Sequence, residues 1–273
     1  MIGDRETLQM STSNIEGKTA VITGSTSGIG LGIATALAEA GANVLLNGLG
    51  DVDAIETTRK ELDALGAGDV LYHPADMTRP DEIADMIACA NRDLGGVDIL
   101  VNNAGIQFVS AIEEFPTDKW DAIIAINLSS SFHTIRAAIP LMKTAGWGRI
   151  VNIASAHALI ASPFKAAYVA AKHGVLGLTR TVSLEVAEEN ITVNAICPGY
   201  VKTPLVENQI TDTAKVRGIS EEEVVRDVIL AAQPSKKFIE ISELADLTLF
   251  LCSDGGASIN GTALSVDGGW SAH

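Results

Sequence analysis

Short apolar runs alternate with longer amphipathic stretches along this chain. The runs are rich in Val, Ile and Leu without polar alternation, which is typical of parallel strands buried on both faces. Because strand and helix patterns follow one another, the connections must be right-handed crossovers, which predicts a single doubly wound α/β domain with a parallel sheet. The seven predicted strands are Thr19–Thr23, Asn43–Asn47, Val70–His73, Val97–Asn102, Arg149–Ala154, Thr192–Ile196 and Thr262–Val266.

One connection is much longer than the others. About forty-five residues separate the sixth predicted strand from a helix that starts near Ser242, whereas most α/β connections are short. Within this segment, Ser220 and Glu223 have the spacing of a capping box and precede an apolar helical pattern. A helical insertion after a strand's carboxyl end is where a substrate lid would lie, so we expect a lid at about residues 200–240. The alternative is that this segment is only a structural excursion of the chain or forms a contact between subunits of an oligomer.

The N-terminal residues differ from the rest of the chain. They include Asp4, Glu6 and Glu16 and contain no apolar block, so they do not have the pattern of a signal or transit peptide. We expect residues 1–16 to form a flexible arm and residues 17–273 to form the single folded domain.

The charge and cysteine content narrow the classes of partner. The formal net charge is −15 over 273 residues. Binding to nucleic acid or to an anionic membrane depends on clustered Lys and Arg, so we expect neither partner. Cys89, Cys197 and Cys252 are scattered and form no Cys-x-x-Cys pair, which suits a reducing compartment and predicts no metal site. We expect a cytoplasmic protein in which an anionic substrate would need a local basic residue.

A glycine-rich turn, Thr23–Gly30, directly follows the first predicted strand and leads into a helix. Gly24 allows the chain to turn sharply, Gly28 lets the backbone approach a pyrophosphate, and Gly30 allows close packing of helix and strand. The free N–H groups at the start of the helix would then face the phosphate charge. Taken alone, a glycine-rich sequence is equally compatible with a tight turn. Its position between the first strand and the first helix indicates a Rossmann-type dinucleotide site.

Tyr168 and Lys172 lie four residues apart in a helical pattern over Ala166–Glu185. This spacing places both side chains on one face of the helix. A Tyr has an ordinary pKa near ~10, and one cation about 4 Å away at an effective dielectric near 20 stabilises the phenolate by about 4 kcal/mol, or about three pKa units. The pair can therefore form an acid/base unit, although Tyr-x3-Lys alone more often represents a packed ring beside a solvated amine.

Several further motifs stand at the predicted strand ends. Asn102-Asn103-Ala104-Gly105 follows the fourth strand, Ser155 follows the fifth, and Pro198-Gly199 follows the sixth. Together with the glycine-rich turn and the Tyr168/Lys172 pair, these motifs resemble the short-chain dehydrogenase/reductase family in order and spacing over residues 17–270. This family transfers a hydride between a nicotinamide cofactor and an alcohol or ketone.

The resemblance implies a role for each residue of a catalytic set. Ser155 would hydrogen-bond the substrate oxygen, and Tyr168 would donate or accept its proton. Lys172 would lower the pKa of Tyr168 and hold the nicotinamide ribose, and Asn127 would hold a water molecule in the proton relay. Taken alone, Ser155 is equally compatible with a helix cap, and Asn127 with a core amide whose hydrogen bonds are all made within the protein.

The cofactor expected from these motifs is NAD. A 2′-phosphate would need a basic partner, and neither the glycine-rich turn nor the segment Asn47–Asp51 contains Lys or Arg. Asp76 and Met77 resemble the family pair that contacts adenine, although Asp76 can equally cap a helix that starts near Pro80. The expected cofactor-binding residues are Gly24, Thr26, Gly28, Ile29, Gly30, Leu49, Asp76, Met77, Asn103, Ala104, Gly105, Tyr168, Lys172, Pro198, Gly199, Val201 and Thr203.

A narrower resemblance concerns the substrate. The segments Asn103–Gln107, Ala154–His157 and Thr203–Gln209, with Lys165 three residues before Tyr168, resemble the branch of the family that interconverts (R)-3-hydroxybutyrate and acetoacetate. The residues that this implies for substrate binding are Gln107, His157, Lys165 and Gln209 around the carboxylate, and Trp270 as an apolar wall. One departure is Tyr200, where that branch usually has Trp, and the smaller ring would admit a slightly larger 3-hydroxy acid.

Two other functions are compatible with the same sequence. One is another reductase of this family, such as a 3-oxoacyl reductase that uses NADPH, although the chain lacks the basic signals expected for it. The other is a non-catalytic NAD-binding regulator, which would have no need of Ser155, Tyr168 and Lys172. The resemblance also implies a homotetramer, formed through the helices after the fourth and fifth strands and the C-terminal segment.

Overall fold

The computed structural model describes residues 15–66, 68–203, 206–207, 210–211, 214 and 218–272. Within these residues a seven-stranded parallel sheet has the order β3-β2-β1-β4-β5-β6-β7. The strands are β1 (Thr19–Ile22), β2 (Asn43–Asn47), β3 (Val70–His73), β4 (Ile99–Asn102), β5 (Gly148–Ile153), β6 (Ile191–Pro198) and β7 (Ala263–Val266). The predicted doubly wound sheet is confirmed, and no predicted strand end differs from the observed one by more than two residues.

The strand order reverses at β1, which pairs with β2 on one side and with β4 on the other. Val21 is in register with Leu45 of β2 and with Leu100 of β4. The connections that leave β1 and β4 therefore run to opposite faces of the sheet and open a crevice at the carboxyl ends of the strands. Ligands of doubly wound sheets bind in this crevice.

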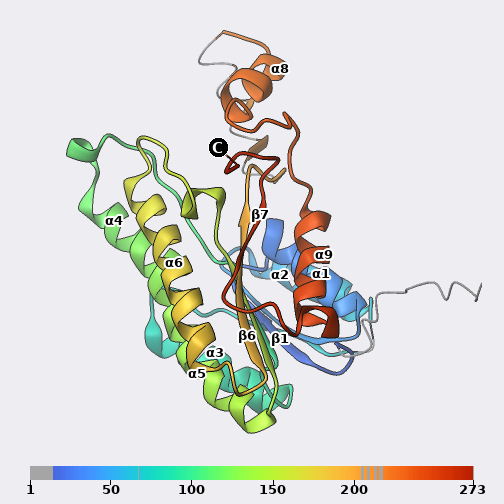
Figure 1. The fold of residues 1–273 in the computed structure, drawn as a ribbon. Helices are drawn as coiled ribbons and strands as arrows, with labels where there is room; N and C mark the ends of the chain where they lie inside the picture. Colours follow the sequence, from blue (N-terminus) through green and yellow to red (C-terminus); the bar gives the residue numbers. More distant parts are fainter. Residues whose placement is uncertain are drawn as a thin grey trace, which may run out of the picture.

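Helices cover both faces of the sheet (Figure 1). On one face lie α1 (Gly28–Glu39), α2 (Val52–Asp63) and α9 (Ile241–Cys252). On the other lie α3 (Pro80–Asp93), α4 (Thr117–Ile124), α5 (Ser130–Ala145) and α6 (Ala166–Glu185). A short helix, α8 (Glu221–Val224), stands beyond the end of the sheet.

Two apolar clusters form the core, one on each face. Alternate residues along a strand belong to different clusters: Ile22 packs with α1 and α9, whereas Val21 packs with α3 and α5. Both residues are fully buried, as expected for central parallel strands. Helix α4, a π-helical turn (Ala125–Ser129) and α5 form one continuous apolar helix, long enough in length and composition to cross a membrane, and 39% of its most apolar window is buried. It lies on one face of the sheet, where Ile135, Ala138 and Met142 of α5 are buried in the core.

The packed domain begins earlier than the sequence predicts. Ile15 is fully buried in the core, and the N–H of Gly17 donates to the carbonyl of Gly41 at 2.9 Å. The folded domain therefore includes Ile15, and its boundary lies before the one expected after residue 16. A single apolar residue in a polar stretch is enough to attach the chain to the core. Residues 1–14 of the expected arm lie outside the described residues.

The segment expected to form a lid has a small core of its own. Ile210, Val224, Ile229 and Leu230 pack together, apart from the main clusters. The predicted capping box is confirmed, since Ser220 and Glu223 bond each other's backbone N–H groups at the start of α8. A π-helical turn, Val225–Ile229, continues this helix.

Candidate active site

The glycine-rich turn after β1 has the backbone that only glycine adopts without strain. Gly24 and Gly28 have φ angles of +62° and +57°. A Cβ at Gly24 would lie 2.9 Å from the Cα of Ala104, and a Cβ at Gly30 would overlap the side chain of Asn103 and the carbonyl oxygen of Gly24. The close packing predicted for Gly30 therefore involves the turn after β4 as well as the turn after β1.

The N-terminus of α1 is open to a ligand. Ser27 stands at the N-cap without a side-chain hydrogen bond to the helix, and the first turn contains no acidic residue. Around Gly28 the nearest atom that an added Cβ would meet is the Cγ2 of Thr203, at 3.7 Å. Backbone N–H groups without partners at the end of a twelve-residue helix attract phosphate groups. The turn thus fits a dinucleotide pyrophosphate.

Hydrogen bonds connect the turns that follow β1, β2 and β4. The side-chain amide of Asn103 donates to the carbonyl oxygens of Thr23 and Gly24, at 3.0 and 2.9 Å. The hydroxyl of Thr23 accepts from the N–H groups of Asn103 and Ala104, both at 3.0 Å. Asn47, which ends β2 and is fully buried, accepts from the N–H of Gly24 at 3.2 Å. Sequence reasoning missed Asn47, although a polar residue that ends a buried strand must find internal partners.

The other residues expected to bind cofactor lie at the same edge of the sheet. Asp76 accepts from the backbone N–H and the hydroxyl of Thr78, each at 2.8 Å, so it forms the turn that precedes α3. Met77 is buried, whereas Leu49 is 68% exposed. Asp51 is the N-cap of α2, and its side chain accepts from the N–H of Ala54.

The turn after β6 closes this edge. It contains Pro198 as the last strand residue, then Gly199, Val201 and Thr203. A Cβ at Gly199 would lie within 3.0 Å of the Cα of Asp267, so this position requires glycine. Val201 is buried and pairs with Ile239 through a parallel bridge, which joins the start of the lid segment to its end.

Tyr168 and Lys172 lie on one face of α6, as predicted. The Nζ of Lys172 is 5.6 Å from the centroid of the Tyr168 ring and donates to the carbonyl oxygen of Ile153, the last residue of β5, at 2.7 Å. Lys172 is only 4% exposed, and burial lowers its pKa to about 8. The ammonium is therefore charged at pH 7 and held at the end of β5.

The pKa of Tyr168 differs from the expectation. Burial raises the pKa of Tyr168 above its ordinary value, a hydrogen bond with Ser155 lowers it, and the neighbouring Tyr200 raises it. The helical spacing predicts the attraction of the ammonium, whereas the desolvation of the phenolate acts in the opposite direction and depends on the packing around the ring. Burial and the Lys172 ammonium therefore act in opposite directions on the pKa of the phenol.

Ser155 and Asn127 occupy strongly ordered positions. The hydroxyl of Ser155 accepts from the N–H of His157 at 3.1 Å and caps the short 3-10 helix η3 (Ala156–Ala158). Asn127 lies in the π-helical turn between α4 and α5, and its amide group accepts from the N–H of Ile106 at 2.8 Å and donates to its carbonyl at 2.9 Å. Asn127 thus holds the loop that leads to Gln107, which is exposed.

Aromatic and basic side chains gather beside Tyr168. His157 is 4% exposed, its Nε2 lies 2.9 Å from the hydroxyl of Ser162, and its ring is edge-on to Tyr168 at 5.9 Å and to Trp270 at 5.0 Å. The Nζ of Lys165 lies 5.7 Å above the ring of Tyr200. Burial, together with the charge of Lys165, lowers the pKa of His157 to about 4, so this imidazole is neutral at pH 7.

This cluster joins most of the residues expected around the substrate. The ring of His157 contacts the rings of Tyr168 and Trp270. Trp270 also stacks on Tyr200, which neighbours Tyr168 and carries the Lys165 ammonium over its ring. Gln209 lies outside the described residues.

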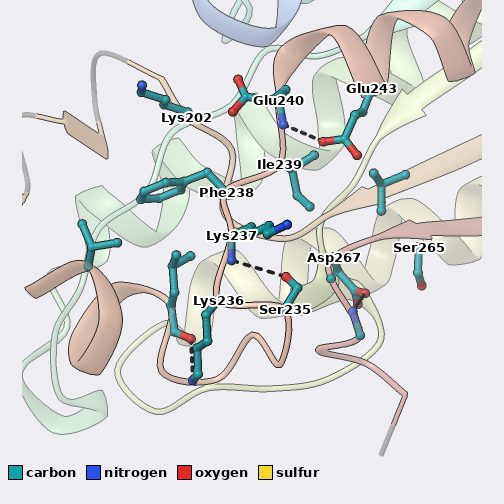
Figure 2. A pocket seen from close by; sticks show the side chains of 15 residues that line it. Lys202, Ser235, Lys236, Lys237, Phe238, Ile239, Glu240, Glu243, Ser265 and Asp267 are labelled. Carbon is teal, nitrogen blue, oxygen red and sulfur yellow. Dashed lines mark hydrogen bonds between the residues drawn. The ribbon is translucent and has the colours of Figure 1, made fainter. Parts of the chain in front are cut away.

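A separate pocket of about 720 Å³ lies behind the turn after β6 and contains none of the expected site residues (Figure 2). Lys202, Lys236, Lys237 and Glu240 are among the residues around it.

The fold and these contacts define a dinucleotide-dependent oxidoreductase, and comparison with known proteins identifies the family. A family model described as enoyl-(acyl carrier protein) reductase matches residues 24–271. The chain belongs to the short-chain dehydrogenase/reductase family and acts on a CH–OH group with a nicotinamide cofactor.

Individual relatives are similar over nearly their whole length. The chain is 65% identical over 255 residues to the D-beta-hydroxybutyrate dehydrogenase of Rhizobium meliloti (strain 1021), covering 93% of this chain and 99% of that protein. It is 54% identical over 259 residues to the D-beta-hydroxybutyrate dehydrogenase of Cupriavidus necator, covering 94% and 99%. The crystal structure of L-sorbose reductase from Gluconobacter frateurii with NADPH and L-sorbose superimposes with a TM-score of 0.88 and 32% identity, covering 93% and 96%.

Proposed function

We propose that this protein oxidises (R)-3-hydroxybutyrate to acetoacetate reversibly, with NAD as the hydride carrier. The observation that carries the proposal is the position of Lys165. Its ammonium is partly buried beside His157 and Tyr200, and among the residues that the structure describes no carboxylate pairs with it. A desolvated cation without an ionic partner attracts the carboxylate of a small acid. The names of the two similar dehydrogenases support the same substrate.

The residues at the end of β5 and on α6 carry the proton chemistry in this proposal. Tyr168 accepts the hydroxyl proton during oxidation, and Ser155 hydrogen-bonds the same oxygen. Lys172 is charged below its pKa of about 8 and stabilises the phenolate. NAD⁺, when bound, would supply the hydride acceptor and a positively charged ring. That charge would act against the burial that raises the pKa of Tyr168.

The substrate carboxylate is held on the side of Lys165 and His157. Because His157 is neutral above about pH 5, it offers a single N–H and adds no charge. Gln107 and Gln209 complete the set in the proposal, and Asn127 supports Gln107 through the backbone of Ile106. Trp270 provides an apolar wall for the methyl group.

NAD is proposed over NADP because the turns after β1 and β2 contain no basic residue. We also propose a cytoplasmic homotetramer without nucleic-acid or membrane partners. Large apolar side chains on the outer faces of the helices support the assembly, since Phe132 of α5 is 47% exposed and Leu184 of α6 is 80% exposed.

The proposal is tested by steady-state assays with both enantiomers of 3-hydroxybutyrate, each with NAD and with NADP. We expect turnover of the R enantiomer with NAD to exceed every other combination. Activity confined to the S enantiomer would overturn the stereochemical assignment. Faster reduction of a 3-oxoacyl thioester with NADPH would identify an acyl reductase instead.

A variant tests the carboxylate site. Lys165→Ala removes a charge-assisted hydrogen bond worth about 2 kcal/mol, so we expect the KM for 3-hydroxybutyrate to rise about 30-fold. The kcat should change by less than about threefold, because Lys165 lies outside the proton-transferring set. The methyl ester of the substrate, which has no charge to lose, should show little change in KM.

Lys237→Ala is the matched control. Lys237 lines the separate pocket of Figure 2, so its removal takes away the same formal charge without affecting the carboxylate site. We expect its KM to equal that of the unmodified protein. Equal rises in KM for both variants would mean that the general field of the protein, and not Lys165, attracts the substrate.

A further inference from the structure

Tyr200 is the first residue of the segment expected to form the lid. It lies in the turn after β6, and both of its backbone polar groups are bonded to residues near the other end of that segment. Its N–H donates to the Oε1 of Gln233 at 3.1 Å, and its carbonyl accepts from the N–H of Ile239 at 2.9 Å. Gln233 is fully buried, so the backbone of Tyr200 is rigidly placed.

The ring of Tyr200 has two neighbours of different kinds. The indole of Trp270 stacks on it with a centroid distance of 5.3 Å and an interplanar angle of 8°. The ammonium of Lys165 lies over the same ring at 5.7 Å from its centroid. An aromatic face carries negative partial charge and attracts a cation, more strongly where water is excluded.

Lys165 depends on this ring for its position. The amine is partly buried, and the described part of the chain contains no carboxylate within ion-pairing distance of it. A lysine side chain has several freely rotating bonds, and a cation without a fixed partner would turn towards solvent. The face of Tyr200 holds the ammonium inside the site without neutralising it.

The other side of Tyr200 belongs to the lid. Its side chain packs against the cluster formed by Ile210, Val224, Ile229 and Leu230. The side chain of Tyr200 therefore contacts the lid cluster, the ammonium of Lys165 and the indole of Trp270.

We propose that Tyr200 is a positioning residue, which holds the Lys165 ammonium against its ring face and thereby sets the preference of the enzyme for acids over neutral analogues. This inference rests on the proposed function.

The experiment compares Tyr200→Leu with Tyr200→Phe, using 3-hydroxybutyrate and its methyl ester as substrates. Tyr200→Leu keeps an apolar contact with the lid but removes the π face, so we expect kcat/KM for the acid relative to the ester to fall about tenfold, through KM. Tyr200→Phe keeps the face and should retain the ratio within about twofold. If Tyr200→Leu does not fold, Tyr200→Met takes its place.

A double variant separates positioning from simple packing. In a Lys165→Ala background, Tyr200→Leu should produce no further fall in the ratio, since the ring acts through the ammonium. An undiminished further fall would overturn the proposal, as would equal losses for Tyr200→Phe and Tyr200→Leu, or an unchanged ratio in Tyr200→Leu. Failure of the proposed function is recognised separately, because the unmodified protein would then show no preference for the acid.

Discussion

Tyr168→Phe should lower kcat for the oxidation of 3-hydroxybutyrate by about a thousandfold. The substitution removes only the hydroxyl that transfers the proton. The phenyl ring keeps its edge-on contact with His157, which has a centroid distance of 5.9 Å in the structure. We therefore expect the KM to stay within about threefold and the affinity for NAD, measured by fluorescence titration, to be nearly unchanged.

The contrast between turnover and cofactor affinity is the informative result. A Tyr168→Phe variant that binds NAD and retains full turnover would show that another group transfers the proton. Ser155→Ala gives a useful comparison, because it removes a partner of the same substrate oxygen and leaves the phenol in place. We expect its loss to be smaller than that of Tyr168→Phe.

Lys172→Met should lower kcat about a hundredfold and at the same time stabilise the protein. At 5.6 Å from the ring centroid, the ammonium stabilises a phenolate by about 3 kcal/mol at an effective dielectric near 20. Because burial already raises the pKa of Tyr168, loss of this cation should move the acidic limb of the pH–rate profile to higher pH. Kinetics between pH 6 and 10 measure the displacement.

The stability effect follows from the pKa of Lys172, which is lowered from 10.5 to about 8. The unfolded chain binds the proton more tightly than the folded one, so the charged lysine destabilises the fold by about 3 kcal/mol below pH 8. This destabilisation disappears as the pH rises from about 8 to 10.5. Methionine avoids it but leaves the carbonyl of Ile153 without its donor, so we expect a net gain of about 1 kcal/mol at pH 7.

Chemical denaturation of both proteins at pH 7 and pH 10 checks this prediction. The advantage of Lys172→Met should be present at pH 7 and lost or reversed at pH 10. A variant that is less stable than the unmodified protein at both pH values would show that the hydrogen bond to Ile153 outweighs the desolvation of the ammonium. Such gains in stability with loss of activity are expected where a buried charge serves catalysis.

The expectations that failed concern single groups in a packed environment. A helical spacing of four residues was sufficient to place Tyr168 and Lys172 on one face, but it contained no information on the depth at which the phenol is buried. Ile15 was assigned to the arm because its neighbours in sequence are polar, whereas its neighbours in space are the apolar residues of the core. Both errors arise because desolvation is a property of the tertiary environment.

The sequence by itself determined the order of strands and helices along the chain, the glycine-rich turn, the helix face that Tyr168 and Lys172 share, and the family. These features depend on local periodicity, on backbone conformations reserved for glycine and on spacing within one helix, all of which are written in neighbouring residues. Only the tertiary structure decided that Tyr200 lies between Lys165, Trp270 and the lid core, and that His157 is neutral. Burial and contacts between segments far apart in the chain exist only once the sheet and the lid have packed, and electrostatics in a site depend on both.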